Sequence, residues 1–359
     1  MKIKTGILQN MVAKAIKGSS DNKMIPITSL MGINYVDNKL KLLTTDGSNI
    51  LTIIEKLELN SLDGAASFYT IVNAETFSKL VAKTTTEYIT LTIRENYLEV
   101  QGNGTYKLEI PLDEDGKVIN FPSSEVNESK LVELNVEELK NSLLKSKVSV
   151  AQTMEIPCLT GYYLSDKIIT TNREMVSCIN KKLLDEPLLI SSEMAELLQL
   201  IEGEKIALKI ENTKMLFINE NVEIYGKQLE GIEMYPVKAL DGLMDLSYEN
   251  EIKVNKTELL NVLERMELFV TPYDKNGIKL AFAKDGLLVT SQKSNAQELI
   301  DAKCEVEEEF NCLIDIEMLK SQIQVNSSEE ILIYYGQEKS IKLVDNDTII
   351  IICLLDENN

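Results

Sequence analysis

Three separated stretches of this sequence follow one pattern. Each runs from a glycine through an alternating segment, a polar turn and a second alternating segment to a Thr-Thr or Thr-Ser pair. The stretches are residues 24–46, 155–172 and 276–292, with their glycines at Gly32, Gly161 and Gly277. These glycines lie 129 and 116 residues apart, which is the length of a domain and not of one solenoid turn. The pattern therefore predicts three similar domains.

Amphipathic helices are predicted on both sides of each stretch. The expected ranges are 5–17, 135–148 and 255–268 before the stretches, and 73–86, 191–204 and 315–326 after them. Suitable N-cap residues begin five of these helices: Asn73, Asn135, Ser191 or Ser192, Asn255 and Asp315. Alternating strands with turn signals follow each second helix and indicate antiparallel hairpins. The predicted class is α+β, with two helices packed on antiparallel sheets in each domain.

Two joints separate the repeats. Proline, acidic and small residues cluster at 119–129 and 239–251, so the predicted domains are 1–126, 127–246 and 247–359. A chain of 359 residues is also too long for one ordinary core. The alternative is α+β patterning by coincidence, which would have to occur three times in the same order.

The composition excludes several kinds of chemistry. The sequence has no histidine, so histidine bases and histidine-ligated zinc are excluded. It has no phosphate-binding loop, and residues 112–118 resemble a calcium loop but place Gly116 and the carboxylates wrongly, which favours a turn. No cofactor, metal or catalytic residue is therefore predicted. Chemistry that uses carboxylates alone stays open.

The cysteines and the hydropathy indicate a cytosolic protein. Five scattered cysteines without a CxxC pair are typical of reduced, mostly buried thiols; they are Cys158, Cys178, Cys304, Cys312 and Cys353. No apolar run is long enough to cross a membrane, and the N-terminus lacks the apolar core of a signal peptide. The net charge of −20 argues against nucleic acid unless basic residues gather on one surface.

The ordered motifs of the whole chain resemble the bacterial DNA polymerase III beta subunit, the sliding clamp, in a divergent or phage-encoded form. The supporting segments are "IPITSLMGI" and "TTDGS" in the first repeat, "PCLTGYYL" and "KQLEGIEMYPVKAL" in the second, and "NGIKLAF" and "IIIICLL" in the third. No single segment is highly specific, whereas their order and spacing are.

The resemblance implies a homodimer of three-domain chains, closed head to tail into a ring, so that each chain forms half of the ring. Double-stranded DNA passes through the hole without sequence readout. The ring is not an enzyme, and it tethers the DNA polymerase for processive synthesis in a bacterial cytoplasm or a phage-infected host. Two other classes stay open: a protein-interaction scaffold with no DNA role, and an enzyme that uses carboxylates or a metal on a multidomain α+β scaffold.

The resemblance also implies that the helices and nearby loops face the DNA with basic or polar side chains. These are Lys14, Lys17, Lys23, Lys79, Lys83, Lys140, Lys145, Lys147, Gln152, Lys256, Arg265 and Lys320. The predicted helix 191–204 disagrees, because it has four glutamates and no basic residue. The alternative is that these lysines lie on ordinary solvated helix faces.

A second implied site is a hydrophobic groove between domains 2 and 3, where polymerase and clamp-loader subunits insert short linear peptides. Its expected residues are Leu159, Thr171, Met175, Val176, Met234, Leu240, Ser340, Ile350, Ile352 and Leu354. Ile350 and Ile352 fit a core strand equally well. The chain departs from the family at 171–174, where "TNRE" replaces a glycine and basic residues, and at its acidic end "CLLDENN". These departures put the peptide preference in doubt.

The third implied site is the joint between subunits. A strand at 104–110 would pair with a strand at 297–305 of another copy. The expected interface residues are Tyr106, Lys107, Phe269, Val270, Glu298 and Leu299, with an ion pair from Lys107 to Glu298. Closure would also protect strand edges that otherwise aggregate.

Overall fold

The computed structural model describes residues 1–57, 67–122, 124–127, 130–293, 295–302 and 309–356. The chain divides into two compact units. The first unit holds Met1–Glu138 and Glu193–Gln228, and the second holds Leu139–Ser192 and Leu229–Asn359. Cys304 and the end of the predicted joint segment 297–305 lie outside the described residues.

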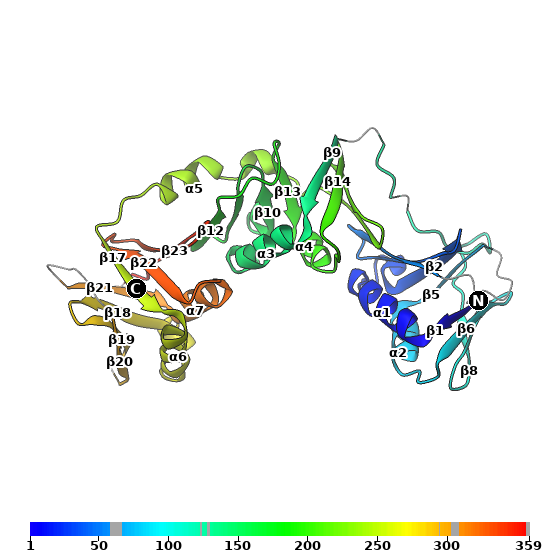
Figure 1. Cartoon of the computed structure of the whole chain (residues 1–359), viewed down its shortest axis with the longest axis horizontal. Helices are drawn as coiled ribbons and strands as arrows, with labels where there is room; N and C mark the ends of the chain where they lie inside the picture. Colours follow the sequence, from blue (N-terminus) through cyan, green and yellow to red (C-terminus); the bar gives the residue numbers. More distant parts are fainter. Residues whose placement is uncertain (58–66, 123, 128–129, 294, 303–308, 357–359) are drawn as a thin grey trace. The chain divides into compact units, whose positions relative to one another are not determined.

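The first unit contains two antiparallel sheets (Figure 1). The four-stranded sheet has the order β1 (Lys2–Lys4), β6 (Tyr88–Ile93), β7 (Tyr97–Gln101) and β8 (Thr105–Glu109). The eight-stranded sheet has the order β5 (Phe68–Asn73), β2 (Leu30–Val36), β3 (Lys39–Thr45), β4 (Ile50–Lys56), β16 (Val222–Lys227), β15 (Lys214–Ile218), β14 (Lys205–Glu211) and β9 (Lys130–Asn135). Helices α1 (Thr5–Ala15) and α2 (Ala74–Ala82) pack against each other.

The second unit repeats this plan. Its eight-stranded sheet has the order β13 (Leu188–Ser191), β10 (Gly161–Leu164), β11 (Ile168–Thr171), β12 (Met175–Ile179), β24 (Thr348–Cys353), β23 (Ser340–Asp345), β22 (Glu330–Tyr335) and β17 (Asn250–Asn255). Its four-stranded sheet has the order β20 (Gln297–Asp301), β19 (Gly286–Ser291), β18 (Gly277–Ala283) and β21 (Phe310–Asp315). Helices α6 (Lys256–Met266) and α7 (Ile316–Val325) pack against each other, and α5 (Val237–Met244) contacts β24.

All six predicted helices are confirmed, although each is shorter than expected. The two not yet bounded are α3 (Val136–Ser146) and α4 (Ser192–Leu198). Asn73, Asn135, Asn255 and Asp315 act as predicted N-caps, since each side-chain oxygen accepts a backbone N–H two or three residues later. The hydroxyl of Ser192 instead donates to the Thr160 carbonyl at 2.8 Å. Helix α5 was not predicted, because most of its residues fall in the range 239–251 that was assigned to a joint.

The repeated pattern forms the hairpins β2–β3, β10–β11 and β18–β19. The first threonine of the pair ties the second strand to the end of the preceding helix. The Thr44 hydroxyl donates to the Ala15 carbonyl at 2.6 Å, and the Thr170 hydroxyl donates to the Ser146 carbonyl at 2.8 Å. The Thr-Thr pair therefore recurs because it anchors helix to sheet in equivalent places.

Two of the anchor glycines, Gly32 and Gly161, leave room for side chains of the segments that follow their repeats. A Cβ on Gly32 would lie 3.1 Å from the ring of Phe121. A Cβ on Gly161 would lie 2.9 Å from the Leu229 side chain and 2.5 Å from the Ile190 carbonyl. Each glycine thus allows an apolar residue of the following segment to close over the sheet.

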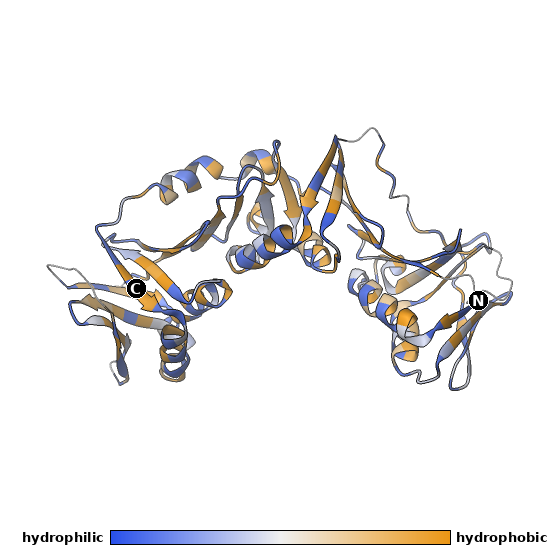
Figure 2. Ribbon diagram, viewed as in Figure 1, coloured by the Kyte–Doolittle hydropathy of each residue, from blue (hydrophilic) through white to orange (hydrophobic). Residues whose placement is uncertain are grey.

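The core of the last repeat lies between its two sheets. Apolar residues of α6 and α7 share one buried cluster with strands β17 to β24, and the Phe282 and Tyr335 rings stack at 4.0 Å within it. Figure 2 shows the matching division of the helices into apolar and polar faces. Burial of each large apolar side chain stabilises the fold by roughly 1.5–3 kcal/mol.

The eight-stranded sheets join strands of successive repeats, because β4 pairs with β16 and β12 pairs with β24. The two sheets of the middle repeat consequently belong to different units. The predicted three-domain division at 126/127 and 246/247 stays a prediction, while the matching strand orders account for the repeat in the sequence.

Smaller predictions are also answered. Residues 112–118 form the expected turn, with a bridge from Leu112 to Val118 and a positive φ at Gly116. The side chains of Cys158, Cys178 and Cys312 are buried, and that of Cys353 is more exposed. No helix in the described part of the chain is long and apolar enough to cross a membrane.

Candidate functional site

A largely apolar groove of about 490 Å³ lies in the second unit. Strands β12 and β24 form its floor, helix α5 and Leu246 form one wall, and residues before β23 form its rim. Its lining comprises Leu159, Thr171, Arg173, Val176, Pro236, Leu240, Leu243, Leu246, Gln337, Glu338, Lys339, Ser340, Ile351 and Cys353. A concave surface of this size, with a few polar groups among apolar ones, suits short apolar side chains of a ligand.

Half of the predicted groove residues meet here: Leu159, Thr171, Val176, Leu240 and Ser340. Met175, Ile350 and Ile352 are buried in the core of the last repeat, and Leu354 packs against that core. Met234 is 67% exposed and is absent from the groove lining.

Strand alternation explains the difference along β24. Successive side chains of a strand point to opposite faces. Ile350 and Ile352 point into the core, so Ile351 and Cys353 line the groove. The run "IIIIC" contains no polar residue that would reveal which face is which. Helix α5 was not predicted from the sequence, and so Pro236, Leu243 and Leu246, which line the groove on or beside this helix, were not predicted either.

The thiol of Cys353 is neutral at ordinary pH. The residue is exposed in part, but the groove partly desolvates its thiol, and this effect, followed by the nearby Glu174 carboxylate, raises the pKa of Cys353 above its usual value of 9.0. The groove floor therefore carries no charge from this residue.

Arg173 occupies a left-handed backbone position where the first repeat has a glycine. Its φ is 82°, and that of Gly47 is 101°. The Asn172 side chain accepts the N–H groups of residues 174 and 175 at 3.0 and 2.7 Å, as Asp46 does for residues 48 and 49 at 2.8 and 2.7 Å. Residues 171–174 thus keep the loop conformation of the first repeat and add a guanidinium at the groove edge.

A second, more polar pocket of about 580 Å³ adjoins the groove and shares Leu159 and Arg173 with it. Gln152 lines this pocket, together with Thr153 and Glu155. The guanidinium of Arg173 lies 3.8 Å from the Glu155 carboxylate, and both side chains are mostly exposed. An exposed pair of this kind is weak and can exchange for a ligand group.

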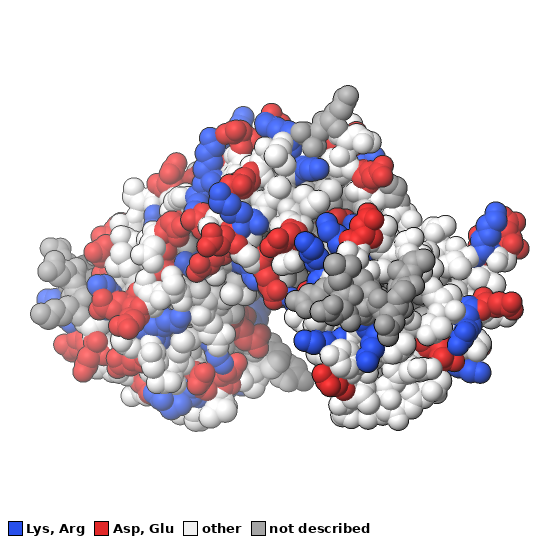
Figure 3. Space-filling view, turned by 45° about the vertical axis from the view of Figure 1, so that its right-hand side comes forward, with Lys and Arg blue, Asp and Glu red and all other residues white. Residues whose placement is uncertain are grey.

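The predicted DNA-facing side chains fall into two groups. Lys17, Lys23, Lys83, Lys147 and Gln152 are exposed. Several others are engaged within the chain, in these pairs: Lys14 with Glu202 at 2.7 Å, Lys79 with Glu75, Arg265 with Glu298 at 2.6 Å and Lys320 with Glu267 at 2.6 Å. Lys140 is half-buried. Figure 3 shows basic and acidic side chains intermixed on the face that it presents.

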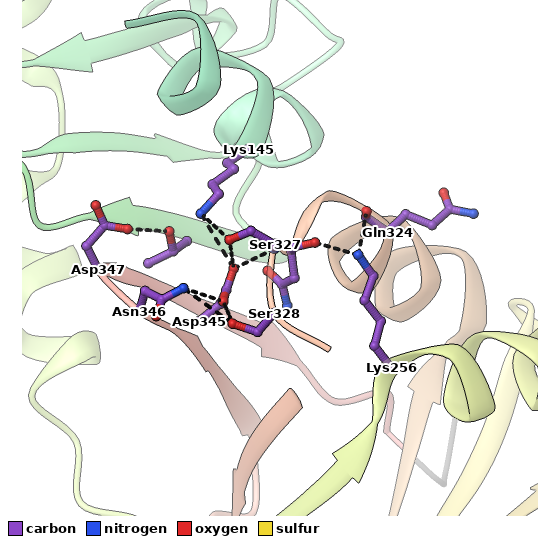
Figure 4. Close-up of polar contacts among 10 residues, drawn as sticks. Lys145, Lys256, Gln324, Ser327, Ser328, Asp345, Asn346 and Asp347 are labelled. Atoms are coloured by element: carbon purple, nitrogen blue, oxygen red, sulfur yellow. Dashed lines mark hydrogen bonds and ion pairs between the residues drawn. The ribbon is translucent and has the colours of Figure 1, made fainter. Parts of the chain in front are cut away.

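Lys145 and Lys256 make contacts at the loop that follows α7 (Figure 4). The Lys145 ammonium lies 3.5 Å from the buried carboxylate of Asp345 and donates to Ser327 at 3.1 Å. The Lys256 ammonium donates to the carbonyls of Gln324 and Asn326 at 3.2 and 2.5 Å. Both lysines therefore hold the end of α7.

The acidic range 191–204 is only partly helical. Because α4 ends at Leu198, Glu202 and Glu204 lie after the helix. The Glu202 carboxylate pairs with Lys14 of α1 in the first unit. One glutamate of this range thus neutralises a lysine that was expected to face DNA.

Strand β8 is an edge of the four-stranded sheet in the first unit, and β20 is an edge of the four-stranded sheet in the second. Tyr106 on β8 and Leu299 on β20 are 40% and 50% exposed, and Phe269 after α6 is 43% exposed. Val270 packs against the core of the last repeat. The Lys107 ammonium lies 4.8 Å from the centre of the Tyr97 ring. Glu298 binds Arg265 of its own chain, and this hydrogen bond chiefly lowers the pKa of Glu298.

The described residues include no group of three or more cysteine, aspartate or glutamate side chains placed to hold a metal ion. No protein-family model and no curated protein matches the sequence.

Solved structures match the fold over nearly the whole chain. The DNA polymerase sliding clamp of Bacillus subtilis matches with a TM-score of 0.86 at 19% identity, covering 99% of this chain and 98% of that one. The DNA polymerase III beta chain of Streptococcus pneumoniae matches with a TM-score of 0.85 at 19% identity, covering 99% of each chain. The sliding clamp of Pseudomonas aeruginosa, solved bound to griselimycin, matches with a TM-score of 0.87 at 13% identity and the same coverage. The chain therefore has the fold of the sliding clamps, the beta subunits of DNA polymerase III.

Proposed function

We propose that this chain is a DNA polymerase processivity factor that catalyses no reaction. Two copies close into a ring around double-stranded DNA, and the ring tethers a polymerase in the cytoplasm of a bacterium or of a phage-infected cell. The observation that carries the proposal is the match to sliding clamps over 99% of the chain. The first test is the mass in solution: a dimer is expected, and a monomer at every micromolar concentration would contradict the ring.

The order of strands supports a specific joint between the two copies. In the first unit β4, the third strand of its repeat's first sheet, pairs with β16, the last strand of the next repeat. In the second unit β12 pairs with β24 in the same way. The corresponding strands left over are β20 and β8, so the same rule pairs β20 of one copy with β8 of the other. A heterologous contact of this kind, repeated twice, closes a ring.

Phosphate attraction holds the duplex without reading its sequence. We propose that the exposed lysines Lys17, Lys23 and Lys83 supply it. Lysine suits this task because its charge sits on a flexible stem and tolerates any register. The engaged lysines contribute less, since each already neutralises an acid or caps a helix.

The double substitution Lys17→Glu with Lys23→Glu is expected to weaken binding to a short linear duplex and to flatten its salt dependence. Each phosphate contact contributes a slope of about 0.9 in the logarithm of affinity against that of salt concentration, so the slope should fall by about 2. Fluorescence anisotropy at several salt concentrations measures it. The same charge change at Lys39 and Lys117, also exposed, should leave the slope nearly intact. Equal losses in both variants would mean that only net charge matters.

The groove is the proposed docking site for short peptides of the polymerase and of a clamp loader. Its apolar lining and its open rim fit aliphatic and aromatic side chains presented by an extended segment. Arg173, Glu338 and Lys339 at its edge would act on the polar residues that flank such anchors.

Leu243→Ala is expected to weaken binding of a peptide that carries leucine and phenylalanine anchors by about tenfold. Leu243 lines the groove yet is 40% exposed, so its truncation spares the core. Fluorescence polarisation with a labelled peptide gives the affinity. Leu131→Ala, on an exposed leucine of β9 in the first unit, is the matched control and should bind as the unmodified chain does. Equal affinities of all three proteins would contradict this docking site.

A further inference from the structure

Helix α5 and Leu246 form a strap along one wall of the groove, and the first end of this strap is fixed to the eight-stranded sheet of the second unit. Tyr235, just before the helix, is 5% exposed. Its hydroxyl donates to the Ile169 carbonyl on β11 at 3.0 Å, and its ring stacks on Tyr163 at 5.3 Å. In the middle of the helix, Asp241 accepts from Lys167 at 2.5 Å. These contacts hold the beginning of the strap against β10 and β11.

The other end of the strap is fixed by a different strand. The ammonium of Lys342, on β23, donates to the carbonyls of Met244 and Leu246 at 3.3 and 3.4 Å. Carbonyls at the end of a helix have no partner within the helix and carry partial negative charge, which favours a cation there. Lys342 of β23 thus caps the C-terminal end of α5.

Two tyrosines hold Lys342 in place. Its ammonium lies 5.0 Å from the centre of the Tyr248 ring and 5.5 Å from that of Tyr334, within the range of cation–π attraction. The Tyr248 hydroxyl shares a hydrogen bond of 2.9 Å with Ser340, which lines the groove. Burial lowers the pKa of Lys342, against the opposing effect of Asp245, so the site is partly desolvated. The Tyr248 and Tyr334 rings therefore orient the Lys342 ammonium toward the carbonyls at the end of α5.

We propose that Lys342 is a positioning residue for the groove: by capping the end of α5, it sets the distance between Leu243 and Leu246 on the strap and the floor formed by β12 and β24. Lys342 is absent from the groove lining, so a peptide would not touch it. The effect on peptide binding would pass through the strap. The inference rests on the proposed docking function of the same groove.

Lys342→Met tests the proposal in the whole chain. Methionine keeps an apolar stem between the tyrosines but cannot donate to the carbonyls or carry charge. The amides of Asp245 and Leu246, which donate to Asp241 and Leu243 at 3.0 and 3.2 Å, should then exchange hydrogen at least about tenfold faster. Amides of β22 and β23 should keep their rates. Lys342→Arg, which retains charge, donors and aromatic stacking, should restore slow exchange.

Peptide binding is measured on the same proteins with the labelled leucine–phenylalanine peptide. Lys342→Met should bind it at least about tenfold more weakly, while Lys253→Met, an exposed lysine on β17, should bind it as the unmodified chain does. Unchanged exchange at Asp245 and Leu246 would overturn the proposal, and so would faster exchange with unchanged affinity. If the unmodified chain bound no peptide, the docking function would fail, while the exchange rates would still test the cap.

Discussion

Leu299→Pro is expected to weaken the dimer at least about 30-fold and to shorten its retention on circular DNA. The Ser291 N–H donates to the Ala296 carbonyl at 2.9 Å, so residues 298 and 300 of β20 direct their backbone groups toward β19. The N–H of Leu299 then points to the open edge. Proline removes that donor without breaking a bond between β19 and β20.

The expected loss follows from the ring having two identical joints. One ladder hydrogen bond is worth about 1 kcal/mol, so two joints lose about 2 kcal/mol and the dissociation constant of the dimer rises at least about 30-fold. Sedimentation at low micromolar concentration measures it. Leu299→Thr keeps the donor and should stay largely dimeric. An unchanged dissociation constant in Leu299→Pro would exclude β20 from the joint.

Asp345→Ala is expected to destabilise the second unit by about 3 kcal/mol. The Asp345 side chain is fully buried and accepts from Ser327, Ser328, Asn346 and the Lys145 ammonium (Figure 4). Alanine leaves these donors without their acceptor and leaves Lys145 half-buried without its counter-charge. Hydrogen exchange of the β23 and β24 amides reports the free energy of opening.

The control removes an exposed carboxylate instead. Glu75→Ala deletes the partner of Lys79 on the surface of α2, where both side chains are about 70% exposed, and little measurable change is expected. A loss below about 1 kcal/mol in Asp345→Ala would mean that the buried pair adds almost nothing to the fold.

The stabilisation by Asp345 should depend on pH in one direction. Burial alone would raise its pKa, but the hydrogen bonds from Ser328 and Ser327 and the Lys145 charge outweigh burial and lower the pKa below 3.8. A carboxyl whose pKa is lower in the folded state stabilises fully above its unfolded pKa and loses this effect as the pH falls through the folded pKa. The difference between the unmodified chain and Asp345→Ala should therefore be constant from pH 7 to about 5 and should shrink below pH 3.8.

Patterns with a physical period were predictable from the sequence. Alternation and helix spacing located the hairpins and six helices, and short polar side chains located four N-caps. The Thr-Thr pairs were recognised as a repeat, but their role in tying strand to helix depends on contacts between residues far apart in the chain. Helix α5 was not predicted, because its eight residues after a proline are too few to show a clear helical period within a joint.

The site was harder to predict, because the direction in which a side chain points depends on how its strand or helix packs in the folded chain. Four successive isoleucines before Cys353 gave no sign of which face meets the core. The helical spacing put Lys145 and Lys256 on polar faces. In the structure, Lys145 contacts the Asp345 carboxylate instead of water, and Lys256 donates to backbone carbonyls at the end of α7. Arg173 was noted at a position where related sequences have a different residue. Its left-handed backbone, which is typical of glycine, could not be predicted from an arginine.

Topological linkage to DNA is the central claim, and one measurement tests it directly. The protein is assembled on nicked circular DNA, unbound protein is removed by gel filtration, and half of the sample is cut once with a restriction enzyme. The protein is expected to stay with the intact circles and to leave the cut molecules from their ends. Equal retention on cut and intact DNA, or no retention on either, would contradict it.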